Sequence, residues 1–264
     1  MKKTEKKVHI ILKICTIIFY ILFTAFLIYY IFIRYPDATV GLDFKYDSEE
    51  NGYICVGQNV NYLKKSLDDL VIPQTYEGKP VVAIGDYAFA AKSSIDSVTI
   101  PASVIKIGEG AFSSCYYEDK NHNMYIKRIK FERKSQLKYI GDKAFYNCVR
   151  LQKISIPDSV EEIGDYAFAC TVNEKTSFEK IEFGANSRLK ILGDYVFWNN
   201  DGLKIAKLPG SLNQLGLRIF GGCDNLEEIE FNGDINRWYF LSMDTNNDEI
   251  NVRCVNGFAE KKRV

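Results

Sequence analysis

The sequence predicts a β-rich solenoid of short parallel strands, one per coil of about 23 residues, preceded by a single transmembrane α-helix. Three observations predict this fold class: a six-residue motif that recurs along the chain, a short alternating pattern before most copies, and an uncharged apolar stretch near the N-terminus. Both repeated patterns fall within residues 70–231, which we therefore expect to form a repeat domain.

The recurring motif reads Ile-Gly-Asp-x-Ala-Phe, and its last copy, LGLRIF, is eroded. The starts of successive copies are separated by 23, 33, 23, 29 and 23 positions. Copies at such a period stack as coils, because one coil alone cannot bury its apolar side. We expect the glycine to suit a bend, the acidic residue to accept backbone N–H bonds, and the apolar ends to fill the core. The expected core residues are Ile84, Phe89, Ile107, Phe112, Ile140, Phe145, Ile163, Phe168, Leu192, Phe197, Leu215 and Phe220, with the following cysteines Cys115, Cys148, Cys170 and Cys223.

Each coil also carries a short apolar-polar-apolar triplet, which is typical of a strand with one buried and one solvated face. Proline, which cannot donate to a ladder, directly follows four of these triplets. Seven such strands about 4.8 Å apart would form one sheet roughly 30 Å long. The triplets are Leu70–Ile72, Val98–Ile100, Ile129–Phe131, Ile154–Ile156, Ile181–Phe183, Ala206–Leu208 and Ile229–Phe231.

The fixed order of triplet, proline, motif and cysteine, as in LQKISIPDSVEEIGDYAFAC (Leu151–Cys170), resembles the BspA-type leucine-rich repeat, also called the Treponema-type repeat. The resemblance covers roughly residues 42–255. It implies a curved, right-handed leucine-rich-repeat solenoid, displayed mainly by surface or secreted proteins of bacteria and some protists. Some members of that family are reported adhesins, so the resemblance implies an adhesin-like role and no catalytic motif.

Residues 14–33 contain no charged side chain, and twenty residues at about 1.5 Å each match a hydrocarbon core of about 30 Å. Residues 1–34 hold six basic residues and one acidic residue. The positive-inside rule therefore predicts a basic cytoplasmic N-terminus (residues 1–13) and an extracellular repeat domain on the cell membrane. A cleaved signal peptide is the alternative, although its apolar core would be shorter, about 7–15 residues.

The segments that flank the repeats are expected to be a linker and two caps. Residues 34–41 are the linker. Residues 42–69 alternate around a turn that ends in Asn-Gly, which predicts an N-terminal hairpin cap. Residues 232–264 are expected to form a C-terminal cap and tail, with Trp238 as a bulky lid over the last coil.

Composition and motifs argue against several functions. The chain beyond residue 34 has 28 basic and 33 acidic residues, so a nucleic-acid partner is not expected. The only histidines are His9 and His122, and no metal-ligand spacing, phosphate loop or nucleophile-base pair recurs. We therefore expect no cofactor, no metal and no enzymatic activity. We expect buried, mostly reduced cysteines, and leave open disulfides between coils or involving Cys55 and Cys254.

Alternation places two rows of side chains on the outer face of the sheet, which is the predicted contact surface for another protein. Like charges on neighbouring strands require an acidic partner or nearby carboxylates. The candidate partner-binding residues are Arg128, Lys153, Lys180, Lys130, Glu182 and Lys207. The polar insertions at residues 116–125 and 171–178 are further candidates, although a merely solvated surface is an alternative for both.

The alternative function is a cell-envelope structural or carbohydrate-binding module without enzymatic activity. A glycan-binding surface needs exposed aromatic side chains, and the two predicted rows contain none. Tyr87, Tyr166 and Tyr195, inside the motifs, would favour it if they proved exposed and aligned. Oligomeric state and the partner's identity are left open.

Overall fold

The computed structural model describes residues 16, 19–24, 39–59, 68–92, 95–113, 126–171, 176–242 and 251–259. The chain divides into two units, residues 1–38 and 39–264. In the first unit, residues 16 and 19–24 are helical. No helix among the described residues is long and apolar enough to cross a membrane. Most of the predicted span at 14–33, the segment 1–13 and most of the predicted linker lie outside the described residues.

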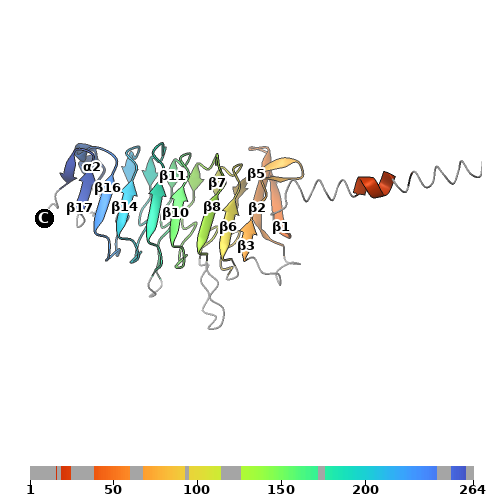
Figure 1. Ribbon diagram of the computed structural model, residues 1–264, viewed down its shortest axis with the longest axis horizontal. Coiled ribbons are helices and arrows are strands. Elements are labelled where there is room, and N and C mark those ends of the chain that lie inside the picture. Colours follow the sequence, from red (N-terminus) through yellow and green to blue (C-terminus); the bar gives the residue numbers. More distant parts are fainter. Residues whose placement is uncertain are drawn as a thin grey trace, which may run out of the picture. The chain divides into compact units, whose positions relative to one another are not determined.

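The second unit is a β-solenoid with parallel strands (Figure 1). The strands begin one residue before the predicted triplets, because the preceding residue also pairs with its neighbour, and all triplets but the first lie wholly within them. These strands are β3 (Asp69–Val71), β6 (Ser97–Ile100), β8 (Arg128–Phe131), β10 (Lys153–Ile156), β12 (Lys180–Phe183), β14 (Ile205–Leu208) and β16 (Glu228–Phe231).

The expected single sheet is divided in two. One sheet has the order β12-β10-β8-β6-β3, and the other has the order β14-β16-β17-β18. Figure 1 shows the strands of both sheets standing side by side along the solenoid, but no ladder joins β12 to β14. The prediction of one continuous seven-stranded sheet was therefore wrong at this boundary.

The sequence pattern missed a second layer of very short strands, each ending at the first residue of a motif. Two residues cannot display an alternation, so no triplet marked them. They are β7 (Lys106–Ile107), β9 (Tyr139–Ile140), β11 (Glu162–Ile163), β13 (Ile191–Leu192) and β15 (Gln214–Leu215). With β5 (Lys79–Ile84), β4 (Thr75–Tyr76) and the N-terminal hairpin, they form a nine-stranded sheet.

The motif phenylalanines form a continuous ladder through the core. Each stacks on the phenylalanine of the next coil, with ring centroids 5.2–5.8 Å apart and nearly parallel planes. The apolar first and last residues of all six motifs are at most 7% exposed. Each buried phenylalanine contributes about 1.5–3 kcal/mol relative to an exposed one, so the ladder is a principal source of stability.

The motif aspartates join one coil to the next. Asp142 Oδ1 accepts a hydrogen bond from the backbone N–H of Asp165 at 2.9 Å, and Asp165 Oδ1 accepts one from Asp194 at 2.7 Å. Asp194 continues the series with the N–H of Leu217 at 2.7 Å. The acidic residues therefore accept backbone N–H bonds, but they do so between coils.

The motif glycine permits close approach of the coils and does not make the bend. A Cβ added to Gly164 would lie 2.2 Å from Asp142 Oδ1 and 2.7 Å from the backbone nitrogen of Asp142. The left-handed backbone belongs instead to the fourth motif position, which is not restricted to glycine. The residues there are Tyr87, Gly110, Lys143, Tyr166, Tyr195 and Arg218, with φ between 45° and 55°.

The cysteines that follow the motifs satisfy backbone carbonyls. The thiol of Cys148 donates to the carbonyl of Phe112 at 3.4 Å, and that of Cys223 donates to Phe197 at 3.1 Å. Asn200, in the equivalent place, donates from Nδ2 to Phe168 O at 2.8 Å. The described cysteines, which are Cys55, Cys148, Cys170, Cys223 and Cys254, are buried, and no disulfide joins any two of them. The predicted core residue Cys115 lies outside the described residues.

Both ends of the solenoid are covered. The hairpin β1 (Leu42–Asp47) and β2 (Gly52–Gln58) is antiparallel, and β2 pairs with β5 in the sheet of short strands. At the other end lie helix α2 (Ile235–Ser242) and strands β17 (Asn251–Cys254) and β18 (Gly257–Ala259). Trp238 in α2 is 3% exposed and its ring lies 5.5 Å from that of Phe231.

Candidate functional site

The outer face of the longer strands carries the predicted rows of polar side chains. Parallel pairing places Arg128 beside Lys153 and Lys153 beside Lys180, so these three exposed cations lie on consecutive strands. The other row runs from Lys130 on β8 through Ser155 on β10 to Glu182 on β12, which pairs in register with Ser155. The structure therefore brings together the predicted cationic row on β8, β10 and β12.

Carboxylates on the protein itself compensate the two ends of this row. Arg128 lies 3.7 Å from Asp96, and Lys180 Nζ lies 2.5 Å from Glu182 Oε1 on the same strand. The hydrogen bond from Lys180, aided by one from Ser155, holds the pKa of Glu182 below its usual value. Exposed pairs of this kind contribute only about 0–1 kcal/mol each.

The middle of the cationic row is less well compensated. Among the described residues, no carboxylate oxygen lies within 4 Å of the Lys153 or Lys130 ammonium groups, whereas Arg128 and Lys180 each have an acidic neighbour. Lys153 therefore presents a positive charge at the centre of the exposed face. An acidic group on a partner would find its ion pair here.

Toward the C-terminus, charges of opposite sign pair across strands. Lys207 Nζ lies 2.7 Å from Glu230, and Arg253 lies 2.7 Å from Glu228. Glu182 and Lys207, on the neighbouring strands β12 and β14, form no ion pair with each other among the described residues. Glu182 bonds Lys180 instead, because no ladder holds β12 in register with β14.

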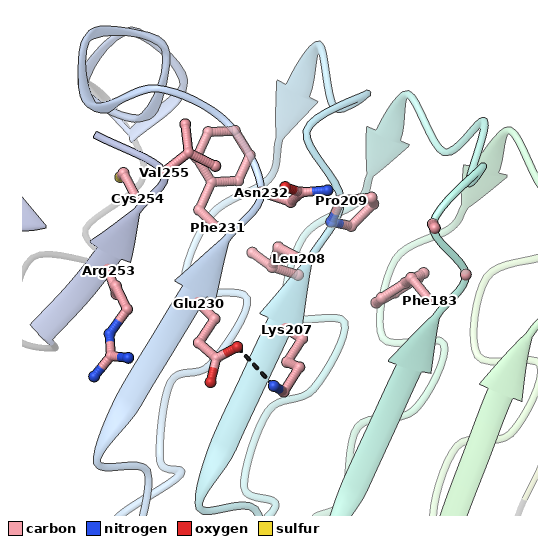
Figure 2. Close-up of a pocket in the computed structure, with 12 residues that line it drawn as sticks. Phe183, Lys207, Leu208, Pro209, Glu230, Phe231, Asn232, Arg253, Cys254 and Val255 are labelled. Carbon is pink, nitrogen blue, oxygen red and sulfur yellow. Dashed lines mark ion pairs between the residues drawn. The ribbon is translucent and has the colours of Figure 1, made fainter. Parts of the chain in front are cut away.

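A groove of about 340 Å³ lies at the carboxyl ends of β12, β14, β16 and β17 (Figure 2). Its apolar lining includes Phe183, Pro209 and Val255, of which Val255 is 67% exposed. Figure 2 shows the Lys207–Glu230 ion pair on the strand side of the groove. The groove thus has an apolar lining, and the charges of Lys207 and Glu230 at its edge neutralise each other.

Sequence reasoning missed this groove, although one signal pointed to it. Phe183 begins a coil in which the next motif follows nine residues later, whereas Ile156 and Leu208 begin coils with a spacing of seven. The longer connection leaves Phe183 only partly buried, while Ile156 and Leu208 are buried. The same spacing follows Phe131, which is also partly buried although β8 pairs with both of its neighbours, so the spacing signals a partly exposed phenylalanine and does not by itself locate the groove.

A metal site and an activated thiol are the two reactive centres that the sequence raised. The described residues contain no group of three or more His, Cys, Asp or Glu side chains placed to hold a metal ion. The one thiol that lines the groove, Cys254, has its pKa raised by burial, which disfavours the thiolate. The arrangement is suited to binding at a surface, through charge and apolar contact.

These features define a class of protein: a coil-repeat solenoid that presents a polar parallel sheet with an adjoining groove. A sequence profile described as BspA type leucine rich repeat region (6 copies) matches residues 56–133, 82–171 and 118–242, more than half of the chain. The chain belongs to the BspA-type leucine-rich-repeat family.

Several solved structures resemble this chain. The pneumococcal vaccine antigen PcpA shares 23% identity over 74% of this chain and 49% of its own, with a TM-score of 0.55. A leucine-rich-repeat protein of T. pallidum (TpLRR) shares 24% identity over 72% and 68% of the two chains, with a TM-score of 0.48. The chain thus spans about half of the PcpA chain, and that likeness shows the fold. A search of curated proteins found no match.

Proposed function

We propose that this protein binds another protein through the exposed face of β8, β10 and β12 and the adjoining groove. The observation that carries the proposal is Lys153, an exposed cation at the centre of a rigid sheet with no carboxylate of the described residues within 4 Å. A specific interface buries about 800 Å² per partner, so one partner could cover both the cationic row and the groove.

The partner that fits this surface is acidic and carries an exposed apolar side chain. Its carboxylates would face Lys153 and Lys130, and its apolar side chain would contact Phe183 and Val255 in the groove. Charge complementarity of this kind mainly raises the association rate and gives specificity. We further propose that the protein acts without enzymatic activity; its described residues contain no group of three or more His, Cys, Asp or Glu side chains that could hold a metal ion.

We also propose that residues 14–33 anchor the protein in the cell membrane, with residues 1–13 in the cytoplasm and the repeat domain on the extracellular side. The uncharged stretch and the preceding lysines support this orientation. Alkaline extraction should leave the protein in the membrane fraction, and a membrane-impermeant amine reagent should label repeat-domain lysines in intact cells. Release by alkali, or labelling only after lysis, would refute the anchor or its orientation.

The binding proposal is tested with the full chain immobilised against envelope and host-matrix fractions. The variant Arg128→Gln, Lys153→Gln, Lys180→Gln should lose most of the captured partner, and wild-type capture should weaken as salt rises. A matched control, Lys106→Gln, Lys138→Gln, Arg188→Gln, removes the same charge from exposed positions outside the row. Equal loss in both variants would indicate a non-specific charge effect, and unchanged capture would exclude the row.

A further inference from the structure

A cluster of four aromatic side chains lies on the motif side of the solenoid, away from the face described above. It consists of Tyr146, Tyr166, Tyr195 and Trp198, all partly exposed. Tyr166 and Tyr195 stack with centroids 4.8 Å apart, and Trp198 lies 5.9 Å from Tyr195 and 6.4 Å from Tyr166. Tyr146 lies 6.5 Å from Tyr166. We call this cluster the aromatic patch.

The fold does not require aromatic residues at these positions. Tyr166 and Tyr195 occupy the fourth motif position, where the first coil also has a tyrosine, Tyr87, but the remaining three coils have glycine, lysine or arginine. Tyr146 and Trp198 directly follow the motif phenylalanine, where the remaining coils have small residues: Ala90, Ser113, Ala169 and Gly221. The core beneath is already filled by the phenylalanine ladder. Four partly solvated rings gathered on three successive coils therefore suggest a ligand.

The rings meet in two orientations. Tyr166 and Tyr195 are nearly parallel, at 12°, and continue the stacking direction of the coils. Trp198 stands at 78° and 69° to them, and Tyr146 stands at 82° to Tyr166. Between Tyr146 and Trp198 in the coil order lies Ala169, which is buried and adds no bulk. The rings of Tyr146 and Trp198 thus lie on either side of the small residue Ala169 along the solenoid.

The charges around the aromatic patch are mixed and favour a neutral ligand. Asp165 and Asp194 each commit Oδ1 to a backbone N–H of the next coil, leaving Oδ2 as an additional acceptor. Lys143 and Arg218 are exposed at the fourth motif position of the coils on either side, and neither has an ion pair among the described residues. Carboxylates and cations therefore flank the same rings.

We propose that the aromatic patch binds a neutral oligosaccharide. A sugar ring has an apolar C–H face that packs on an aromatic ring, and hydroxyl groups that bond carboxylate and phenol oxygens. The patch presents both kinds of group side by side. This site is separate from the proposed protein-binding face, so either proposal can fail without the other.

The test is an array of neutral and acidic glycans probed with the full-length protein in a sugar-free detergent. Wild type should bind neutral glycans, and Trp198→Ala should weaken that binding about 30-fold, a loss typical of truncating an aromatic anchor. Tyr166→Ala should weaken binding as well, and its matched control is Tyr87→Ala, which changes the same motif position at a similar φ, 53° against 55°, three coils away. It should bind like wild type.

A second readout uses the protein's own fluorescence. The chain has two tryptophans, and Trp238 is buried in the C-terminal cap. In a Trp238→Phe background, the bound glycan should protect Trp198 from collisional quenching by iodide, and thermal unfolding verifies that each variant is folded. Absence of binding to neutral glycans, binding restricted to charged glycans or basic peptides, or wild-type affinity in Trp198→Ala would each overturn the proposal.

Discussion

The phenylalanine ladder makes a quantitative prediction, because its members differ in how many neighbours they stack on. Phe145 is 1% exposed and stacks on Phe112 at 5.3 Å and on Phe168 at 5.2 Å. Phe220 is 3% exposed but stacks on one phenylalanine of the described residues, Phe197, at 5.4 Å. Truncating either one removes similar buried area, but truncating Phe145 removes one more ring pair.

Phe145→Ala should lower the free energy of unfolding by about 4 kcal/mol, within the range of about 3–5 kcal/mol for buried phenylalanines. Phe220→Ala should cost about 1 kcal/mol less, since an aromatic pair contributes about 0.5–1.5 kcal/mol beyond its buried area. Urea unfolding of the full chain, followed by circular dichroism, measures both. A cost for Phe145→Ala below about 2 kcal/mol, or no greater than that for Phe220→Ala, would refute the ladder as a source of stability.

Three further predictions follow from close contacts and perturbed groups. Gly164→Ala should destabilise the protein by about 1–3 kcal/mol in the same assay, because its Cβ would overlap the preceding coil. Burial raises the pKa of Cys223 to about 12, so a thiol reagent at pH 8 should modify this cysteine only on unfolding. The hydrogen bond to Glu77, 2.6 Å long, raises the pKa of Tyr53 to about 12, and Glu77→Gln should lower it in a spectrophotometric titration. The contribution of protonated Tyr53, which donates to Glu77, to the free energy of unfolding should be fully present below the tyrosine's unfolded pKa of about 10. It should be lost as the pH rises toward 12.

Each of these predictions has an outcome that contradicts it. Wild-type stability in Gly164→Ala would show that the coils tolerate a wider spacing. Rapid native labelling of Cys223 would show that its burial is transient. A tyrosine titration that Glu77→Gln leaves unchanged would remove the hydrogen bond as the cause of the raised pKa.

The repeat architecture was predictable because its signals are local and periodic. The motif at Ile163–Phe168, the triplet before it and the following Cys170 recur in a fixed order, so the core positions could be assigned individually. The second sheet was missed because strands such as Glu162–Ile163 are too short to alternate. The role of Gly164 was misassigned because the residue it contacts, Asp142, lies 22 residues earlier in the preceding coil. The sequence of a single coil does not show which residues of the neighbouring coil it will contact.

Of the candidate sites, only the cationic row could be predicted in full from the sequence. The row Arg128, Lys153, Lys180 follows from strand alternation and was predicted. The groove lies where β12 and β14 do not pair, and the triplet pattern in the sequence does not indicate which neighbouring strands pair. The aromatic patch was foreseen only through Tyr166 and Tyr195, since Tyr146 and Trp198 lie outside the six-residue motif.

The missing ladder between β12 and β14 has a mechanical consequence. Load along the stack passes through two sheets in most coils. At this seam the longer strands form no ladder, so the short strands β13 and β15 and the hydrogen bonds of the motif turns join the two coils. Tension applied at the C-terminus therefore concentrates there. The terminal coils and their helical cap would detach as one block, leaving the first five longer strands folded on their own ladder.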